Sequence, residues 1–168
     1  MDPLALPDAA LFARRRTVTG PEGTRVLGAE LAQVLSPGDA VLLHGPLGAG
    51  KTCLVQGLCE ALAVGDEVIS PTFTLVNRYR GVHHLDFYRV EPEHDLDDIG
   101  VEDILDELDR GRTLLVVEWP NLLAPWLPRR LELLAVPDAD PDTRTWYVRG
   151  VPDLAASVAA LFPEPNPT

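Results

Sequence analysis

The stretch that decides the fold lies at residues 44–52 and reads His44-Gly45-Pro46-Leu47-Gly48-Ala49-Gly50-Lys51-Thr52. It matches the pattern G-x-x-x-x-G-K-[S/T] without a gap, from Gly45 to Thr52. The apolar run 40–43 precedes it, and apolar side chains follow it at helical spacing, at Leu54, Val55, Leu58 and Leu62. A buried strand, a tight glycine-rich loop and a helix start are the context in which this motif binds a nucleotide phosphate.

The residue types in this stretch suit a phosphate ligand. Backbone N–H groups of such a loop and of the following helix N-terminus converge on an anion, and glycines allow a close approach that a Cβ would block. Lys51 is then expected to reach the β- and γ-phosphates, and the Thr52 hydroxyl to hold Mg²⁺. We therefore predict nucleotide contacts along the loop and the first helical turn, at Gly45, Leu47, Gly48, Ala49, Gly50, Lys51, Thr52 and Cys53.

The composition limits the possible functions. The chain has 168 residues, which fits one domain, and 46% of them are hydrophobic, which is enough for a core. The formal net charge of −12 disfavours direct nucleic-acid binding, because neutralising phosphates supplies much of that affinity. We expect no DNA binding, and a role on nucleic acid only through a partner. No apolar run approaches the roughly 20 residues of a membrane span and no signal-peptide pattern opens the chain, so the expected location is the cytoplasm, without membrane contact.

The predicted domain occupies residues 17–162. Residues 1–16, which end in Arg14-Arg15-Arg16, are expected to be a flexible lead-in, and the proline-rich residues 163–168 a frayed tail. The segment near Thr19, just before the first helix, is our choice for the adenine contact. That helix is predicted from apolar residues that recur on one face, Leu27, Leu31, Val34 and Leu35.

Two hydroxyl side chains, Thr72 and Thr74, lie in the connection that follows the loop helix. The run 67–79 is predicted to hold a short strand, a Ser-Pro-Thr turn at 70–72 and a second strand-like stretch that ends at Tyr79. In phosphate-loop enzymes a Thr in such a connection can sense the γ-phosphate and order a switch segment. The alternative is that a β-branched residue simply favours a strand, and position alone leaves both interpretations open.

Two carboxylates are candidates for the metal side of the site. The run 113–118 reads as a buried parallel strand that ends in Glu118, where a Walker B carboxylate belongs. Glu118 is therefore predicted to hold Mg²⁺, directly or through water, or to orient the attacking water. Val117 stands where an Asp is usual, so a second carboxylate must come from elsewhere. Asp86 is the available candidate, and its alternative is a solvated strand carboxylate.

Residues next to Asp86 and Glu118 in the sequence are also expected near the site. Alternation along the strand-like stretch 82–89 places His84, Asp86 and Tyr88 on one face. Trp119 follows Glu118 directly and either packs over the site or only caps the core.

The remaining stretches complete the predicted fold. Residues 91–109 contain ten acids and no Lys or Arg, and the helix expected there has an acidic face that is either solvated or a docking surface for a basic partner. Strands at 131–136 and 144–149 and a helix at 151–162 follow. Together these elements predict a P-loop NTPase-like α/β fold, a three-layer sandwich with a mixed, largely parallel sheet flanked by helices.

Several separate motifs resemble one family, the small bacterial TsaE (YjeE) ATPases of tRNA threonylcarbamoyladenosine biosynthesis. Besides the phosphate loop, they are Ser-Pro-Thr-Phe-Thr-Leu-Val at 70–76, His-Leu-Asp-Phe-Tyr-Arg at 84–89, Asp-Ile-Gly at 98–100 and Val-Glu-Trp-Pro at 117–120. They occur in the family's order over about residues 17–150.

The resemblance implies slow ATP hydrolysis with Mg²⁺ and docking onto a complex of two paralogous subunits, TsaB and TsaD. That assembly modifies the adenosine next to the anticodon of tRNAs that read ANN codons, so tRNA would be reached indirectly. The family's functional residues correspond to Lys51, Thr52, Thr72, Asp86 and Glu118, which favours a functional reading of Thr72 and Asp86. Cys53 stands where the family commonly has a second Thr, and Pro46 where an acid or polar residue is usual.

Two other functions use the same loop. A small-molecule kinase needs an acceptor pocket and usually an arginine-bearing lid, and the short segment between the two strands predicted after the loop helix offers no obvious one. A nucleotide-bound scaffold would need no hydrolysis. A GTPase is disfavoured because the chain contains no Asn-Lys-x-Asp motif.

Overall fold

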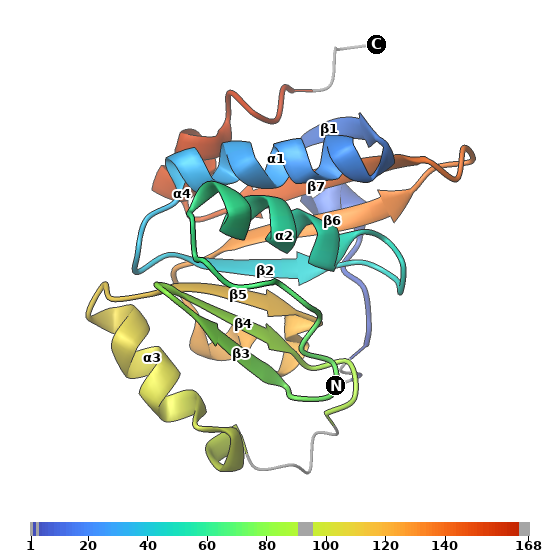
Figure 1. Cartoon of the computed structure of the whole chain (residues 1–168). Helices are drawn as coiled ribbons and strands as arrows, with labels where there is room; N and C mark the ends of the chain where they lie inside the picture. Colours follow the sequence, from blue (N-terminus) through green and yellow to red (C-terminus); the bar gives the residue numbers. More distant parts are fainter. Residues whose placement is uncertain (1, 3, 91–95, 165–168) are drawn as a thin grey trace.

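A seven-stranded sheet forms the centre of the molecule, in the order β1-β7-β6-β2-β5-β4-β3 (Figure 1). The computed structural model describes residues 2, 4–90 and 96–164. The strands are β1 (Arg14–Thr19), β2 (Ala40–His44), β3 (Val76–Tyr79), β4 (Val82–Asp86), β5 (Leu114–Glu118), β6 (Leu131–Pro137) and β7 (Thr143–Gly150).

The sheet is mixed, as predicted. Its central strands β6, β2, β5 and β4 run parallel, whereas the pairs β1–β7, β7–β6 and β3–β4 are antiparallel. The parallel part is thus the middle of the sheet, with two antiparallel pairs toward the β1 edge and one toward the β3 edge.

Helices cover both faces of the sheet and make the predicted three layers. Helices α1 (Gly20–Val34), α2 (Lys51–Ala61) and α4 (Pro152–Val158) pack on one face, and α3 (Val101–Asp109) packs on the other (Figure 1). The short 3-10 turns are η1 (Ala9–Leu11), η2 (Leu96–Ile99), η3 (Pro120–Leu122) and η4 (Ala124–Trp126). Strands between two helical layers bury both faces, which is why β2 and β5 read as continuous apolar runs.

The register of the parallel strands decides where the polar residues meet. Leu43 of β2 pairs with Glu118 of β5, and Asp86 of β4 pairs with the same Glu118. The carboxyl ends of three neighbouring strands therefore lie at one edge of the sheet, next to the loop that leaves β2. Ligands of open α/β sheets bind at this edge.

Two glycines bring α1 and α2 into close contact. A Cβ on Gly28 would lie 2.1 Å from Leu54 O, and a Cβ on Gly57 would lie 2.1 Å from Arg25 O. These distances leave no room for a methyl group, so each helix approaches the backbone of the other. This packing supports α2, whose first turn carries the phosphate loop's Lys and Thr.

The N-terminal boundary predicted at residue 17 is wrong. Residues 14–16, expected in the flexible lead-in, form the first half of β1 and pair with residues 146–148 of β7. Their side chains find acidic partners, because Arg16 pairs with Glu30 and Arg14 with Glu164. Arginines are well suited to an edge strand, where charge discourages pairing with another chain.

The short strand predicted at the start of the run 67–79 is also wrong. Residues 67–70 have no strand conformation, and β3 begins only at Val76. Side chains of β3, and not a second strand, hydrogen-bond the backbone of this segment. Asn77 Nδ2 donates to Ile69 O at 3.1 Å, and the Ile69 N–H donates to Tyr79 Oη at 3.3 Å.

The C-terminal end returns to β1. The Arg15 N–H donates to Pro163 O at 3.5 Å, and the rest of the predicted tail, residues 165–168, lies outside the described residues. The last helix is shorter than the predicted range 151–162, since α4 ends at Val158. Across the described parts of the chain, no helix combines the length and the apolarity needed to cross a membrane.

Gly28→Ala is expected to destabilise the protein by about 1–3 kcal/mol, because the added methyl group would overpack the α1–α2 contact. Chemical denaturation measures this free energy of unfolding. Gly23→Ala in the same helix is the matched control, since its Cβ would make an ordinary 3.4 Å contact with Val18 Cβ and Ala favours a helix over Gly by up to about 1 kcal/mol. Equal free energies of unfolding for the two variants would contradict the close contact.

Candidate functional site

The phosphate loop connects β2 to the first turn of α2, in the context that the sequence predicts. Gly45 has φ 141°, and a Cβ there would come within 2.9 Å of Ala135 O in β6, so the entry to the loop requires glycine. Gly50, with φ 98°, is the N-cap residue of α2. Leu47 and Gly48 are exposed at the tip, whereas Ala49 is fully buried. The helix N-terminus at Gly50 favours an anion.

Lys51 is a buried cation beside the loop. Only 4% of its surface is exposed, and its Nζ donates to Gly45 O at 2.6 Å and to Pro46 O at 2.9 Å. Burial lowers the pKa of Lys51, while the nearby carboxylates of Glu118 and Asp86 oppose this shift. The ammonium group thus lies between the loop backbone and two acids.

Trp119 packs over this cation. Lys51 Nζ lies 4.3 Å from the Trp119 ring centroid, within the range of a cation–π contact, and the Tyr88 and Trp119 ring centroids are 5.0 Å apart. Trp119 also belongs to the core cluster on the α3 side. The alternative that Trp119 only caps the core is therefore wrong, because the side chain packs over Lys51 as well as against the core.

Glu118 joins the loop helix to β4. Thr52 Oγ1 donates to Glu118 Oε1 at 2.8 Å, and His84 Nε2 lies 2.9 Å from the same oxygen. Glu118 is 3% exposed and His84 is fully buried. A hydroxyl that donates to a carboxylate keeps its lone pairs for a cation, so the structure brings Thr52 and Glu118 together as a metal site would require.

Asp86 forms a second group at the same edge of the sheet. Thr72 Oγ1 donates to Asp86 Oδ2 at 2.8 Å, and the Tyr88 N–H donates to Asp86 Oδ1 at 2.8 Å. Asp86 is 2% exposed, so the alternative of a solvated strand carboxylate is wrong. Thr72 lies in a turn rather than in a strand, which removes the argument from strand propensity. The two predicted residues contact one another, and Asp86 pairs with Glu118 through the strand backbone.

A small cavity of about 160 Å³ adjoins the phosphate loop on the α1 side. It is lined by the loop, the β6–β7 connection and the starts of α1, α2 and β7, at Gly20, Pro21, Thr24, Gly48, Gly50, Cys53, Asp142 and Arg144. Cys53 therefore faces the cavity, whereas Thr19 lies one residue before its lining and is exposed.

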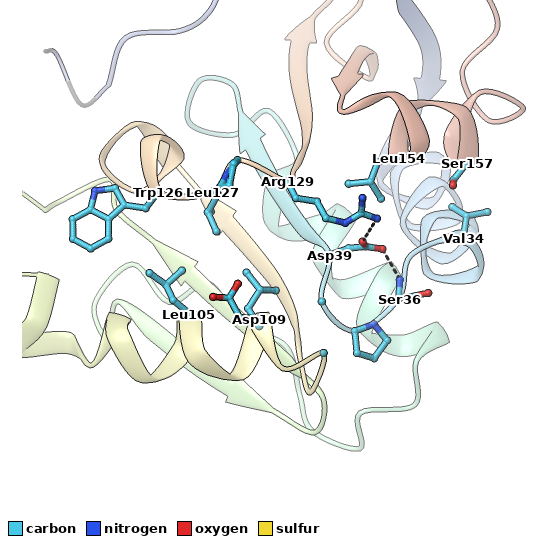
Figure 2. A pocket seen from close by; sticks show the side chains of 15 residues that line it. Val34, Ser36, Asp39, Leu105, Asp109, Trp126, Leu127, Arg129, Leu154 and Ser157 are labelled. Carbon is cyan, nitrogen blue, oxygen red and sulfur yellow. Dashed lines mark hydrogen bonds and ion pairs between the residues drawn. The ribbon is translucent and has the colours of Figure 1, made fainter.

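A larger cavity, of about 570 Å³, lies at the other end of the parallel strands (Figure 2). Its lining residues Ser36, Asp39 and Arg129 precede β2 and β6, and Leu105 and Asp109 belong to α3. Figure 2 shows the Arg129 guanidinium directed at Asp39. Arg129 Nη2 lies 3.2 Å from Asp39 Oδ1. Because the phosphate loop lies at the carboxyl ends of the strands, this cavity is separate from the candidate site despite its size.

Sequence reasoning missed one member of the site, His84. Alternation correctly places His84 and Asp86 on one face of β4, but the contact with Glu118 depends on how β4 and β5 pair. The available signal was a histidine two residues before Asp86 on the face of the site.

Known proteins resemble this chain over most of its length. The family model described as "Threonylcarbamoyl adenosine biosynthesis protein TsaE" matches residues 18–145. The chain is 37% identical over 133 residues to the tRNA threonylcarbamoyladenosine biosynthesis protein TsaE of Bacillus subtilis. This alignment covers 77% of this chain and 80% of that protein.

The protein of the same name from Mycobacterium leprae is 38% identical over 136 residues, with 74% of this chain and 84% of that protein covered. A crystal structure of Bacillus subtilis YdiB superposes with a TM-score of 0.70 at 27% identity, over 88% of this chain and 92% of that one. The chain therefore belongs to the TsaE family.

Proposed function

We propose that this protein binds and hydrolyses ATP as a subunit required for the threonylcarbamoyladenosine modification of tRNAs that read ANN codons. The observation that carries the ATPase part is the contact of Thr52 with Glu118 at the phosphate loop, at 2.8 Å. The pathway is supported by the relatives, which are named for tRNA threonylcarbamoyladenosine biosynthesis.

The donor set at Thr52 suits Mg²⁺, which prefers oxygen ligands. We assign the Thr52 hydroxyl to the metal as a direct ligand, and Glu118 and Asp86 as carboxylates that hold it directly or through water. When bound, Mg²⁺ would neutralise charge on the β- and γ-phosphate oxygens. Thr52 Oγ1 is prepared for this role because it donates to Glu118 Oε1 and so directs its hydrogen away from a cation.

The other residues of the site serve either nucleotide binding or hydrolysis. Lys51 would exchange its bonds to Gly45 O and Pro46 O for the phosphate oxygens of ATP, whose charge is complementary to its own. Glu118, as an acceptor, would orient the attacking water. Thr72, whose hydroxyl donates to Asp86 at 2.8 Å, would sense the γ-phosphate and order the turn in which Thr72 lies.

We place the ribose and base of ATP in the small cavity beside the loop. It adjoins Gly48 and Gly50 on one side and Gly20 on the other, so a nucleotide whose phosphates occupy the loop can extend into it. The adenine contact predicted near Thr19 falls at the rim of this cavity. Cys53 lines the same space and would contact the nucleotide as a small apolar neighbour.

A complex of the TsaB–TsaD type is the expected partner, and the cytoplasm the expected location. A net charge of −12 favours reaching tRNA through such a complex rather than directly. The kinase alternative finds no support, because residues 62–75, between α2 and β3, contain no Lys or Arg for a catalytic lid.

Lys51→Ala is expected to weaken ATP binding about 10- to 100-fold, because a charge-assisted contact contributes roughly 1.5–3 kcal/mol. Glu118→Gln is expected to keep ATP binding but to lower turnover by about 100-fold or more. Calorimetric titration and phosphate release measure the two effects. Glu107→Gln is the control, since Glu107 lies on α3 and contacts His83, and it should change neither value. Full turnover in Glu118→Gln would contradict the hydrolytic role of Glu118. A Glu118→Gln variant that no longer hydrolyses ATP but still supports tRNA modification would favour a scaffold.

Alkylation of the two cysteines tests where the base lies. Burial raises the pKa of Cys53, and it raises the pKa of Cys59 to about 12, so alkylation should speed up as the pH rises and thiolate forms. ATP with Mg²⁺ is expected to slow the alkylation of the half-buried Cys53, as followed by peptide mass spectrometry. Cys59, fully buried, is the internal control and should stay unlabelled throughout. Equal labelling of Cys53 with and without saturating ATP would rule out this base position.

Partner dependence is tested by ATP turnover of the purified chain, alone and with a TsaB–TsaD-type complex. Turnover is expected to rise in the mixture, and the chain to co-elute with the complex in size-exclusion chromatography. The Lys51→Ala variant, mixed in the same way, controls for hydrolysis by the partners. Absence of both stimulation and co-elution would contradict the partner assignment.

A further inference from the structure

His84 is fully buried in β4 and makes a single side-chain hydrogen bond among the described residues. Its Nε2 lies 2.9 Å from Glu118 Oε1, and because a carboxylate only accepts, Nε2 is the donor. Its Nδ1 is also buried and has no hydrogen-bond partner within the described part of the chain. A buried polar nitrogen without a partner destabilises a fold, so an apolar side chain would serve this core position better if stability were the only requirement.

Glu118 needs a donor that is independent of the nucleotide. Both of its contacts fall on Oε1, from Thr52 on α2 and from His84 on β4. The Thr52 hydroxyl has a second task at the metal, whereas His84 has no other partner in the described residues. His84 is held on both sides by the sheet, since it pairs with Asn77 of β3 and with Val116 of β5. The imidazole is therefore the fixed one of the two donors.

We propose that His84 is a positioning residue, whose Nε2–H holds Glu118 Oε1 so that the carboxylate keeps one orientation during ATP hydrolysis. The proposal rests on the ATPase function proposed above. It assigns His84 no contact with nucleotide or metal. Its effect reaches the reaction only through Glu118, so it should appear in kcat and not in the KM for ATP.

His83, the adjacent residue, provides a matched comparison. Its Nε2 lies 2.7 Å from Glu107 Oε2, and its Nδ1 is buried without a partner among the described residues, as in His84. Its side chain, however, is on the opposite face of β4 and contacts α3, away from the phosphate loop. Substituting either histidine removes the same kind of contact, but only one of the two contacts involves the site.

The test compares His84→Leu, His84→Gln and His83→Leu in the full chain. His84→Leu is expected to lower kcat about 10- to 100-fold, the usual effect of removing a residue that orients a functional ligand, with the KM for ATP unchanged and Tm equal or higher. His84→Gln, whose amide nitrogen can occupy the place of Nε2, is expected to recover part of kcat. His83→Leu should keep the kcat of the unsubstituted protein.

Unchanged kcat in His84→Leu would overturn the proposal, and so would an equal loss in His83→Leu or no recovery in His84→Gln. Nuclear magnetic resonance of ¹⁵N-labelled histidines tests the contact without turnover. The His84 Nε2 resonance should be that of a nitrogen carrying hydrogen, and it should shift in Glu118→Gln but not in Glu107→Gln. A resonance insensitive to Glu118→Gln would also overturn the proposal. If the unsubstituted protein does not hydrolyse ATP, the proposed function fails, whereas this resonance still decides whether His84 Nε2–H holds Glu118.

Discussion

The hydrogen bond from Thr52 Oγ1 to Glu118 Oε1 connects the phosphate loop to the neighbouring strand, and the rest of the site is arranged around it. The two residues are 66 positions apart in the chain. They meet because β2 and β5 pair in parallel with Leu43 opposite Glu118, and because α2 begins directly after the loop. A shift of β5 by one residue would turn Glu118 to the other face of the sheet. The apolar neighbours that bury both faces of β5 therefore also fix the position of the carboxylate.

Charge balance explains why so many ionisable groups are tolerated in a buried position. Lys51 loses hydration on burial, and Glu118 and Asp86 compensate part of that loss. The acids in turn have donors of their own, from Thr52 and His84 to Glu118 and from Thr72 to Asp86. Each charged group thus has at least one polar neighbour, as buried charges require.

Much of the site could be predicted from local sequence. The phosphate loop, the buried strands β2 and β5 and the alternation that places Asp86 on the site face all depend on nearest neighbours along the chain. Family membership, inferred from the motifs between residues 70 and 120, is confirmed by the family model. The contact of His84 with Glu118 could not be predicted, because it depends on the pairing of two strands. The prediction of a flexible lead-in at residues 14–16 was wrong for a similar reason, because these arginines form a strand only through their pairing with β7.

The most direct test of the proposed site is a crystal structure of the protein with Mg²⁺ and a non-hydrolysable ATP analogue. We expect the phosphates in the loop 45–50, Mg²⁺ on the Thr52 hydroxyl, Glu118 beside the metal or its water, and the base in the cavity lined by Gly20 and Cys53. A nucleotide bound elsewhere, or a metal held without Thr52 and Glu118, would contradict the proposed site.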